Sequence, residues 1–206
     1  MAVDDRYHGR RVTVLAAVSS TSSGKRVTRK AALLLRDALS PEVRADASAK
    51  IASRATELLA DRHVVALYAP KGSEVDTLAI DENLRARGAR VLYPRMLDNE
   101  RMLEFHEVAP DRLVPSRFGI REPRADWRNQ VGLVEIDAFV VPGLAFDRHG
   151  GRIGFGRGHY DATLAAAARS ALCIGLAFEA QLVPDAHGES HDVTLHVIVT
   201  EATSYP

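Results

Sequence analysis

Residues 137–161 read DAFVVPGLAFDRHGGRIGFGRGHYD, and this stretch decides the fold class. It begins with a continuous apolar run at residues 138–141, which is typical of a fully buried strand. Pro142 and Gly143 end that strand and a glycine-rich loop follows. Residues 160–169 are then rich in alanine, the strongest helix former. A buried strand followed by a loop and a helix is the repeating unit of α/β proteins.

The same alternation of strands and helices continues on both sides of this stretch. Helices are predicted over residues 25–39, 40–61 and 76–87. Further strands are predicted over residues 63–69, 90–93, 102–108, 172–177 and 193–199. Ser40 is a good N-cap and Pro41 suits the first turn of the second helix. This pattern predicts a single three-layer α/β domain, with a mainly parallel sheet, helices on both faces and an active site at the carboxyl ends of the strands.

Composition and charge exclude several classes of protein. The chain has 206 residues, of which 46% are hydrophobic and 26% charged, as in globular rather than disordered or fibrous proteins. Its 27 basic and 27 acidic side chains give a formal net charge of zero, which argues against a nucleic-acid partner held by bulk charge. No apolar run approaches the ~18 residues that span a membrane. The single cysteine, Cys173, suits a reducing compartment. We expect a cytoplasmic monomer that binds small molecules, with no nucleic-acid or membrane partner.

Residues 1–24 are interpreted as a poorly ordered N-terminal extension, so that the main domain occupies residues 25–206. The apolar residues 12–18 suit either a short strand or the core of a signal peptide. Asp4 and Asp5 stand where a signal peptide carries positive charge, which argues against export.

The glycine-rich loop carries the strongest chemical signal. Five glycines fall within residues 150–158, interleaved with Arg152 and Arg157. Free backbone N–H groups, the positive end of a helix dipole and two arginines make an anion site, for which phosphate is the natural ligand. His159 stands where a dinucleotide fingerprint has its third glycine, and the Gly-Lys-Ser/Thr of a Walker loop is absent. The alternative is a tight strand-to-helix turn whose glycines only permit packing.

The predicted helix at residues 25–39 has a basic side. Lys25, Arg29 and Arg36 fall within about a 40° arc at 3.6 residues per turn. The opposite side carries the apolar residues Val27, Ala31, Leu34, Leu35 and Ala38. Arg36 lies about 10 Å further along the helix, at 1.5 Å per residue, so it is not grouped with the other two. The alternative is an ordinary solvated helix face.

Other short motifs are spread along the chain in a fixed order. They are Lys25-x-x-x-Arg29, LSPEVR at 39–44, GSEVDT at 72–77, YPR at 93–95, FGIREP at 118–123, QLVP at 181–184 and His191-Asp192. Together with the stretch at 137–161, they resemble the 5-formyltetrahydrofolate cyclo-ligase family, also called 5,10-methenyltetrahydrofolate synthetases. The resemblance covers about residues 25–200 and implies a NagB/RpiA/CoA-transferase-like fold.

The resemblance also implies a reaction. Such an enzyme closes 5-formyltetrahydrofolate to 5,10-methenyltetrahydrofolate with ATP and Mg²⁺, and it releases ADP and phosphate. A formamide oxygen is a poor leaving group, and its phosphorylation turns it into phosphate, a good one. N10 of the folate then attacks the activated carbon. Positioning and charge stabilisation should therefore dominate catalysis.

The family's functional positions map onto this chain. The implied ATP-binding residues are Lys25, Arg29, Arg152, Ile153, Gly154, Phe155, Gly156, Arg157, Gly158, His159 and Tyr160. The implied folate-binding residues are Ala69, Glu74, Phe155, Gly156, Arg157, Gly158 and His159. Arg157 and Tyr160 are the implied catalytic residues. Asp161 and Asp192 are the implied Mg²⁺ ligands, and oxygen ligands are what Mg²⁺ prefers. Without the family, Asp161 would equally suit a helix cap and Asp192 an ordinary loop carboxylate.

Two positions depart from the family pattern. His159 stands where many members have a tyrosine, and Ala162 replaces a common arginine. These changes leave open a related ATP-dependent ligase or phosphotransferase with another acceptor, or a non-catalytic nucleotide- or folate-binding paralogue.

Three weaker signals remain. His187 and His191 are four residues apart, but Gly188 argues against a helix there and a zinc site is not predicted. Cys173 lies in an apolar strand and is expected to pack rather than react. One loop carries Arg117, Arg121, Arg124 and Arg128. Our hypothesis is that some of these arginines meet the glutamate tail of a folate, and the alternative is a solvated loop.

Overall fold

The computed structural model describes residues 22–116, 118–124, 126, 128–186, 188–189 and 192–206. The helices are α1 (Ser22–Asp37), α2 (Pro41–Leu58), α3 (Leu78–Ala86) and α4 (His159–Ala166), with 3-10 turns η1 (Pro110–Arg112), η2 (Leu133–Glu135) and η3 (Glu179–Gln181). The strands are β1 (Val64–Ala66), β2 (Arg90–Met96), β3 (Leu103–Glu107), β4 (Val114–Pro115), β5 (Arg121–Glu122), β6 (Gln130–Val131), β7 (Ala138–Val141), β8 (Ala145–Phe146), β9 (Arg152–Ile153), β10 (Leu172–Leu176), β11 (Val197–Val199) and β12 (Ser204–Tyr205). The predicted strand at residues 12–18 and most of the predicted extension lie outside the described residues. None of the described helices is both long and apolar enough to cross a membrane.

An eight-stranded sheet forms the centre of the domain, in the order β12-β11-β10-β7-β1-β2-β3-β6. The five central strands β11, β10, β7, β1 and β2 are parallel to one another. The edge strands β12, β3 and β6 pair in the antiparallel sense. Ala138 of β7 is opposite Val65 on one side and Leu172 on the other, so the strand that opens the glycine-rich stretch is central. The prediction of a mainly parallel sheet is confirmed.

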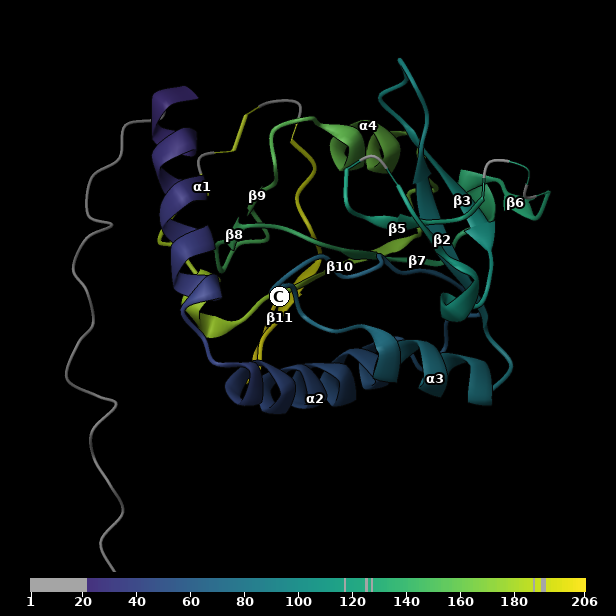
Figure 1. The fold of residues 1–206 in the computed structure, drawn as a ribbon, viewed down its shortest axis with the longest axis horizontal. Helices are drawn as coiled ribbons and strands as arrows, with labels where there is room; N and C mark the ends of the chain where they lie inside the picture. The colour runs from purple at the N-terminus through teal and green to yellow at the C-terminus, as the bar shows by residue number, and fades with distance from the viewer. Residues whose placement is uncertain (1–21, 117, 125, 127, 187, 190–191) are drawn as a thin grey trace, which may run out of the picture.

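Helices cover both faces of this sheet. Figure 1 shows α2 and α3 below the sheet and α4 above it. Alternate residues of β7 point to opposite faces, as the strand pleat requires. Val140 packs in the core on the side of α2 and α3, and Phe139 packs in the core on the side of α4. Each such buried side chain stabilises the fold by roughly 1.5–3 kcal/mol. The predicted three-layer architecture is confirmed.

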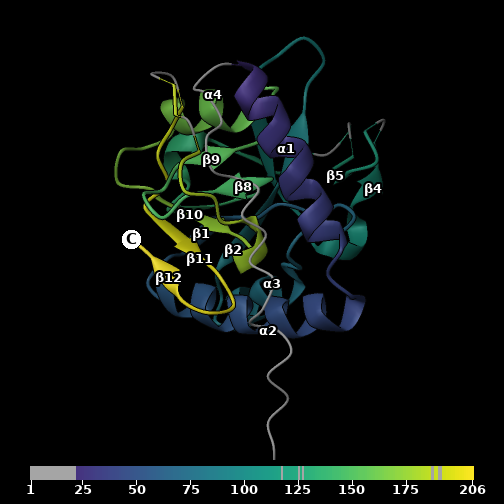
Figure 2. The same ribbon diagram turned by 90° about the vertical axis from the view of Figure 1, so that its left-hand side faces the viewer.

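α1 stands beside the sheet and not on its face, as Figures 1 and 2 both show. Hydrophobic periodicity would assign the apolar stripe of this helix to the core. Val27 and Leu34 are instead 52% and 62% exposed. The buried side carries Thr28, Ala32 and Arg36. Because polar contacts from the basic side hold this helix in place, the alternative of a solvated basic face is wrong.

Candidate active site

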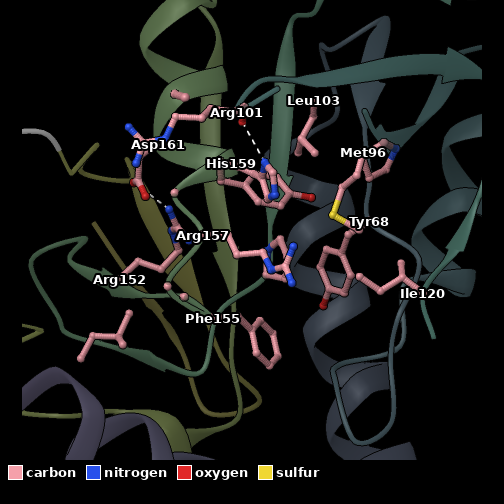
Figure 3. Close-up of a pocket in the computed structure, with 18 of the residues that line it drawn as sticks. Tyr68, Met96, Arg101, Leu103, Ile120, Arg152, Phe155, Arg157, His159 and Asp161 are labelled. Atoms are coloured by element: carbon pink, nitrogen blue, oxygen red, sulfur yellow. Dashed lines mark hydrogen bonds and ion pairs between the residues drawn. The ribbon is translucent and has the colours of Figure 1, made fainter. Parts of the chain in front are cut away.

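A cavity of about 890 Å³ opens at the carboxyl ends of β1, β2 and β7. Tyr68 follows β1, Met96 ends β2 and Pro142 follows β7, and all three line the cavity. An open parallel sheet ordinarily binds its ligands at this edge. Figure 3 shows Arg152 and Asp161 on one side of the cavity, with Tyr68 and Met96 on the other.

Every residue predicted for the site lines this one cavity. They come from α1, the segment after β1, the glycine-rich loop, the start of α4 and the loop before β11. The set comprises Lys25, Arg29, Ala69, Glu74, Arg152, Ile153, Gly154, Phe155, Gly156, Arg157, Gly158, His159, Tyr160, Asp161 and Asp192. The fold thus brings together groups up to 167 positions apart in the chain. The separate role of each residue stays a prediction.

The glycines of the loop fall into two groups. Gly150 and Gly151 lie in the turn between β8 and β9, where a side chain at Gly150 would collide with the carbonyl oxygen of Leu195. The remaining glycines follow β9 and line the cavity. The packing-turn alternative is therefore right for the first two glycines, and the count of five overstated the part of the loop that a ligand can reach.

The basic side of α1 faces the cavity. Lys25 Nζ lies 2.8 Å from both Glu189 Oε1 and Asp192 Oδ2. Burial lowers the pKa of Lys25, but its hydrogen bonds to these two carboxylates outweigh burial and leave the pKa raised. Arg29 Nε donates a hydrogen bond of 2.9 Å to the carbonyl oxygen of Gly154. Arg29 is therefore held against the glycine-rich loop and Lys25 against the segment before β11, and an anionic ligand in the cavity could accept charge-assisted hydrogen bonds from both.

The two predicted metal ligands share one end of the cavity. Asp161 Oδ1 accepts hydrogen bonds from Arg152 Nη2 at 2.8 Å and from the backbone N–H of Val193 at 3.3 Å. The second bond ties Asp161 to the residue that follows Asp192. Asp161 lies in the first turn of α4, whose N-cap is Gly158, so the helix-cap alternative is wrong. Each of the two carboxylates is already paired with a side-chain cation.

Another end of the cavity is built around Glu74. Its side chain is only 7% exposed, and Oε2 accepts a hydrogen bond of 2.9 Å from the backbone N–H of Lys71. Burial raises the pKa of Glu74 above its usual range, although the Lys71 N–H and the charge of Arg36 act to lower it. Tyr68 and Ala69 are buried and line the cavity directly after β1. This end offers a buried carboxylate among apolar and aromatic groups.

The two predicted catalytic side chains have different surroundings. The guanidinium of Arg157 is exposed and lies 4.2 Å from the centre of the Phe118 ring. Burial, and then the nearby Glu74, raise the pKa of Tyr160. Its hydroxyl therefore stays protonated at neutral pH and can donate a hydrogen bond but cannot act as a base. Arg157 is thus an exposed residue that stacks on Phe118, whereas Tyr160 packs in the cavity wall.

Sequence reasoning missed several cavity residues. Tyr68 could have been found, because a residue directly after a central parallel strand lies at the ligand-binding edge. Glu189 contacts the lysine of α1, but nothing distinguished it from other loop carboxylates. The carbonyl oxygen of Arg101 lies 2.9 Å from His159 Nδ1 (Figure 3), and no pattern in the sequence could have indicated a backbone contact of this kind.

The arginine-rich loop reaches the cavity through Phe118, Ile120 and Glu122, but its described arginines do not line it. These arginines are Arg121, Arg124 and Arg128. Arg121 donates to the carbonyl oxygen of Leu113, and Arg124 pairs with Asp126. Arg117 lies outside the described residues. The contacts of Arg121 and Arg124 favour the alternative of a solvated loop.

The single cysteine lies apart from the cavity. Cys173 is 5% exposed, and burial raises its pKa to about 11, as expected of a packing residue. His187 and His191 lie outside the described residues. Within the described part of the chain, no group of three His, Cys, Asp or Glu side chains could hold a metal ion.

Comparison with known proteins agrees with this geometry. Residues 21–201 match the model of the 5-formyltetrahydrofolate cyclo-ligase family. The chain is 36% identical over 140 residues to the 5-formyltetrahydrofolate cyclo-ligase of Mycolicibacterium smegmatis, covering 66% of this chain and 72% of that one. It is 33% identical over 172 residues to the Escherichia coli (strain K12) 5-formyltetrahydrofolate cyclo-ligase, covering 80% and 93%. The NMR structure of Aquifex aeolicus 5,10-methenyltetrahydrofolate synthetase matches with a TM-score of 0.75 at 31% identity, covering 87% of this chain and 91% of that one.

Proposed function

The chain belongs to the 5-formyltetrahydrofolate cyclo-ligase family, and from this premise we propose that it closes 5-formyltetrahydrofolate to 5,10-methenyltetrahydrofolate with ATP and Mg²⁺, releasing ADP and phosphate. One observation carries the proposal. Separate segments of the chain place a glycine-rich loop, four cations, two carboxylates and the buried Glu74 around one cavity. The loop and the cations suit a triphosphate, the two carboxylates suit a divalent cation, and Glu74 suits a pterin ring.

The proposed reaction has two stages. The formyl oxygen attacks the γ-phosphorus of ATP, and the bond between that phosphorus and ADP breaks. The formyl carbon then carries a phosphate leaving group. N10 of the folate attacks this carbon, the carbon–oxygen bond breaks with release of phosphate, and N10 loses its proton. The product carries a methenyl bridge between N5 and N10.

The loop end of the cavity suits the triphosphate. Backbone N–H groups at the start of α4 and the positive end of its dipole favour an anion there. Lys25, Arg29 and Arg152 are held beside the loop, and each can donate charge-assisted hydrogen bonds to phosphate oxygens. Exposed Arg157 is the cation that can follow the phosphoryl group during transfer, and protonated Tyr160 can donate a hydrogen bond to the reacting oxygen.

The carboxylates Asp161 and Asp192 fit a divalent cation at the same end. Their donor atoms are oxygens, and Mg²⁺ commonly uses one or two carboxylates and takes its other ligands from phosphate and water. When bound, Mg²⁺ would neutralise negative charge on the phosphate oxygens. In the free enzyme Lys25 and Arg152 neutralise these two carboxylates. We expect both cations to turn to the phosphates when the nucleotide and its metal bind together.

The Glu74 end suits the folate ring. A carboxylate can accept hydrogen bonds from the ring N–H and amino groups of a pterin. Ala69 provides a small buried wall beside it. Phe155 is 58% exposed and lines the cavity, so its ring can cover a bound ligand at little cost in folding energy.

We further propose that the enzyme works as a monomer in the cytoplasm. One chain supplies every predicted site residue to the cavity, so no second copy is needed to complete it. The single cysteine is buried and needs no oxidising compartment.

The test is an absorbance assay. Purified protein incubated with 5-formyltetrahydrofolate, ATP and Mg²⁺ should produce the near-ultraviolet band of the methenyl product, with one ADP and one phosphate released per product. Reactions without ATP, or with a metal chelator, are the controls. A folded protein that binds ATP and forms no band would contradict the proposed acceptor.

A further inference from the structure

Arg36 is a buried charged residue that the proposed reaction does not use. It is 3% exposed and is absent from the cavity lining. Its Nε donates a hydrogen bond of 2.9 Å to Ser73 Oγ, and Ser73 in turn donates to the carboxylate of Asp37. These two hydrogen bonds hold Ser73, the residue directly before Glu74, against α1.

The other end of this guanidinium faces Glu74. Arg36 Nη1 is buried and has no hydrogen-bond partner among the described residues. It lies 3.8 Å from Glu74 Oε1, close enough for charge attraction but beyond a hydrogen bond. A buried donor without a partner is destabilising, so packing alone does not account for an arginine at this position.

We propose that Arg36 is the positioning residue of Glu74: it keeps this buried carboxylate charged and aimed into the cavity, so that Glu74 can accept hydrogen bonds from the folate ring. The inference rests on the proposed function, because that function makes Glu74 a folate ligand. It explains both why Arg36 is buried and why its hydrogen bond to Ser73 holds it beside Glu74.

Among the groups around Glu74, Arg36 is the one best placed to keep its carboxylate charged. The groups that face the carboxylate are Arg36 from α1, Lys71 from its own loop, and the hydroxyls of Tyr68 and Tyr160. Lys71 is exposed, and its ammonium donates to the carbonyl oxygen of Phe118 at 2.6 Å. Water and salt screen an exposed charge more than a buried one. Arg36 is therefore the cation with the stronger hold on Glu74.

Calorimetric binding of 5-formyltetrahydrofolate, without ATP, tests the proposal directly. Arg36→Met should weaken folate binding at about pH 7 by about 10-fold or more, the scale of a lost interaction with a charged group. ATP binding should change by less than about 2-fold, because the loop cations are untouched. Arg36→Lys should recover part of the folate affinity. Ser73→Ala, which removes the anchor and keeps the charge, should have the smaller effect.

A double-mutant cycle separates positioning from a general structural role. Glu74→Gln should itself weaken folate binding, and Arg36→Met added to it should cost less than about 3-fold more, because the two residues act through one interaction. In the Arg36→Met variant alone, folate affinity should start to fall at a higher pH than in the wild type, since the lost cation no longer opposes protonation of Glu74.

Three outcomes would overturn the proposal. The first is a double mutant whose loss of folate affinity equals the product of the losses in the two single mutants. The second is an Arg36→Met variant in which ATP binding and folate binding weaken equally. If Arg36→Met does not fold, the third is an Arg36→Lys variant that folds, keeps the charge and still binds folate no better than Glu74→Gln. A wild-type protein that does not bind 5-formyltetrahydrofolate would overturn the proposed function together with this inference.

Discussion

The loop end and the Glu74 end of the cavity manage charge in opposite ways. At the loop end, Asp161 and Asp192 each have a cation at 2.8 Å, and the pair between Lys25 and Asp192 joins segments 167 positions apart in the chain. At the other end, Glu74 and Arg36 are both buried, are 3.8 Å apart and leave one guanidinium nitrogen without a partner. The loop end is held by short ion pairs and the Glu74 end contains a single longer one, and each end has one buried guanidinium nitrogen without a hydrogen-bond partner among the described residues.

This difference indicates what each end can accept. Short ion pairs in the cavity wall can be exchanged for phosphate–cation and metal–carboxylate pairs without stranding any charge, so the loop end suits a polyanion that carries a divalent cation. A buried carboxylate with a raised pKa and few partners gains most from neutral N–H donors, so the Glu74 end suits a heterocycle. We therefore expect the cavity to separate the two proposed ligands by electrostatics.

The largest effect is expected at the loop end, from Asp161→Asn. This change keeps the shape of the side chain and removes the charge that would hold the metal. We expect Mg²⁺-dependent turnover to fall by about 10³-fold or more, because metal stabilisation of transition-state charge contributes several kcal/mol. Steady-state kinetics with methenyl absorbance measures it. Asp111→Asn, an exposed change away from the cavity, is the matched control. Turnover within about 10-fold of wild type would contradict the metal role.

Lys25→Met should have the next largest effect and should act on one ligand only. The substitution removes the bonds of Lys25 to Glu189 and Asp192 in the free enzyme and its expected bond to phosphate in the complex. We expect the KM for ATP to rise by about 10- to 100-fold, the scale of a charge-assisted hydrogen bond, with the KM for folate nearly unchanged. Lys30→Met, an exposed lysine of the same helix, should change neither. A larger rise for folate than for ATP would reverse the assignment of the two ends.

The Glu74 end should show the stronger pH dependence. Burial raises the pKa of Glu74, so this carboxylate takes up its proton at a higher pH than an exposed glutamate does. The protonated form accepts hydrogen bonds poorly, so the KM for folate should rise as the pH falls, starting at a higher pH than the titration of an exposed glutamate would give. Its limiting slope is tenfold per pH unit below the pKa. Glu74→Gln should flatten the profile. A KM for folate that stays flat in wild type as the pH is lowered to the titration range of an exposed glutamate would disprove the raised pKa of Glu74.

Much of the fold could be predicted because apolar strands have a strong signal. The prediction for β7 matched its residues, since an apolar run that Pro142 and Gly143 end so early is too short for a helix. The prediction at 193–199 was too long, and only Val197–Val199 belongs to the sheet. The N–H groups of Val193 and Leu195 bond instead to Asp161 and to the loop, which no local pattern reveals.

The parts of the site that a sequence motif specifies could be predicted. The parts that depend on contacts between distant segments could not. The loop and its carboxylates were expected together, and they line one cavity. The orientation of α1 was not predictable, because Lys25, Arg29 and Arg36 hold it through polar groups while Val27 stays exposed. Arg36 was set aside because of its distance along the helix. A loop 37 positions later passes close to it, and helical geometry contains no such information.

The smallest effects are expected when a glycine with positive φ is replaced by alanine at each end of the cavity. Gly156, at the loop end, has φ of +90°, and Gly72, two residues before Glu74, has φ of +62°. Alanine at either site would cost about 1–2 kcal/mol in a left-handed conformation. A Cβ at Gly156 would also lie 3.4 Å from the guanidinium of Arg29, whereas one at Gly72 meets no atom within 4 Å. The two variants should therefore lose similar thermal stability but affect different ligands. Gly156→Ala should raise the KM for ATP a few-fold because the loop and Arg29 shift, and Gly72→Ala should raise the KM for folate by less because only the approach to Glu74 moves. Paired thermal melts and kinetics would check this, and equal changes in both KM values for both variants would mean that the two ends respond as one unit.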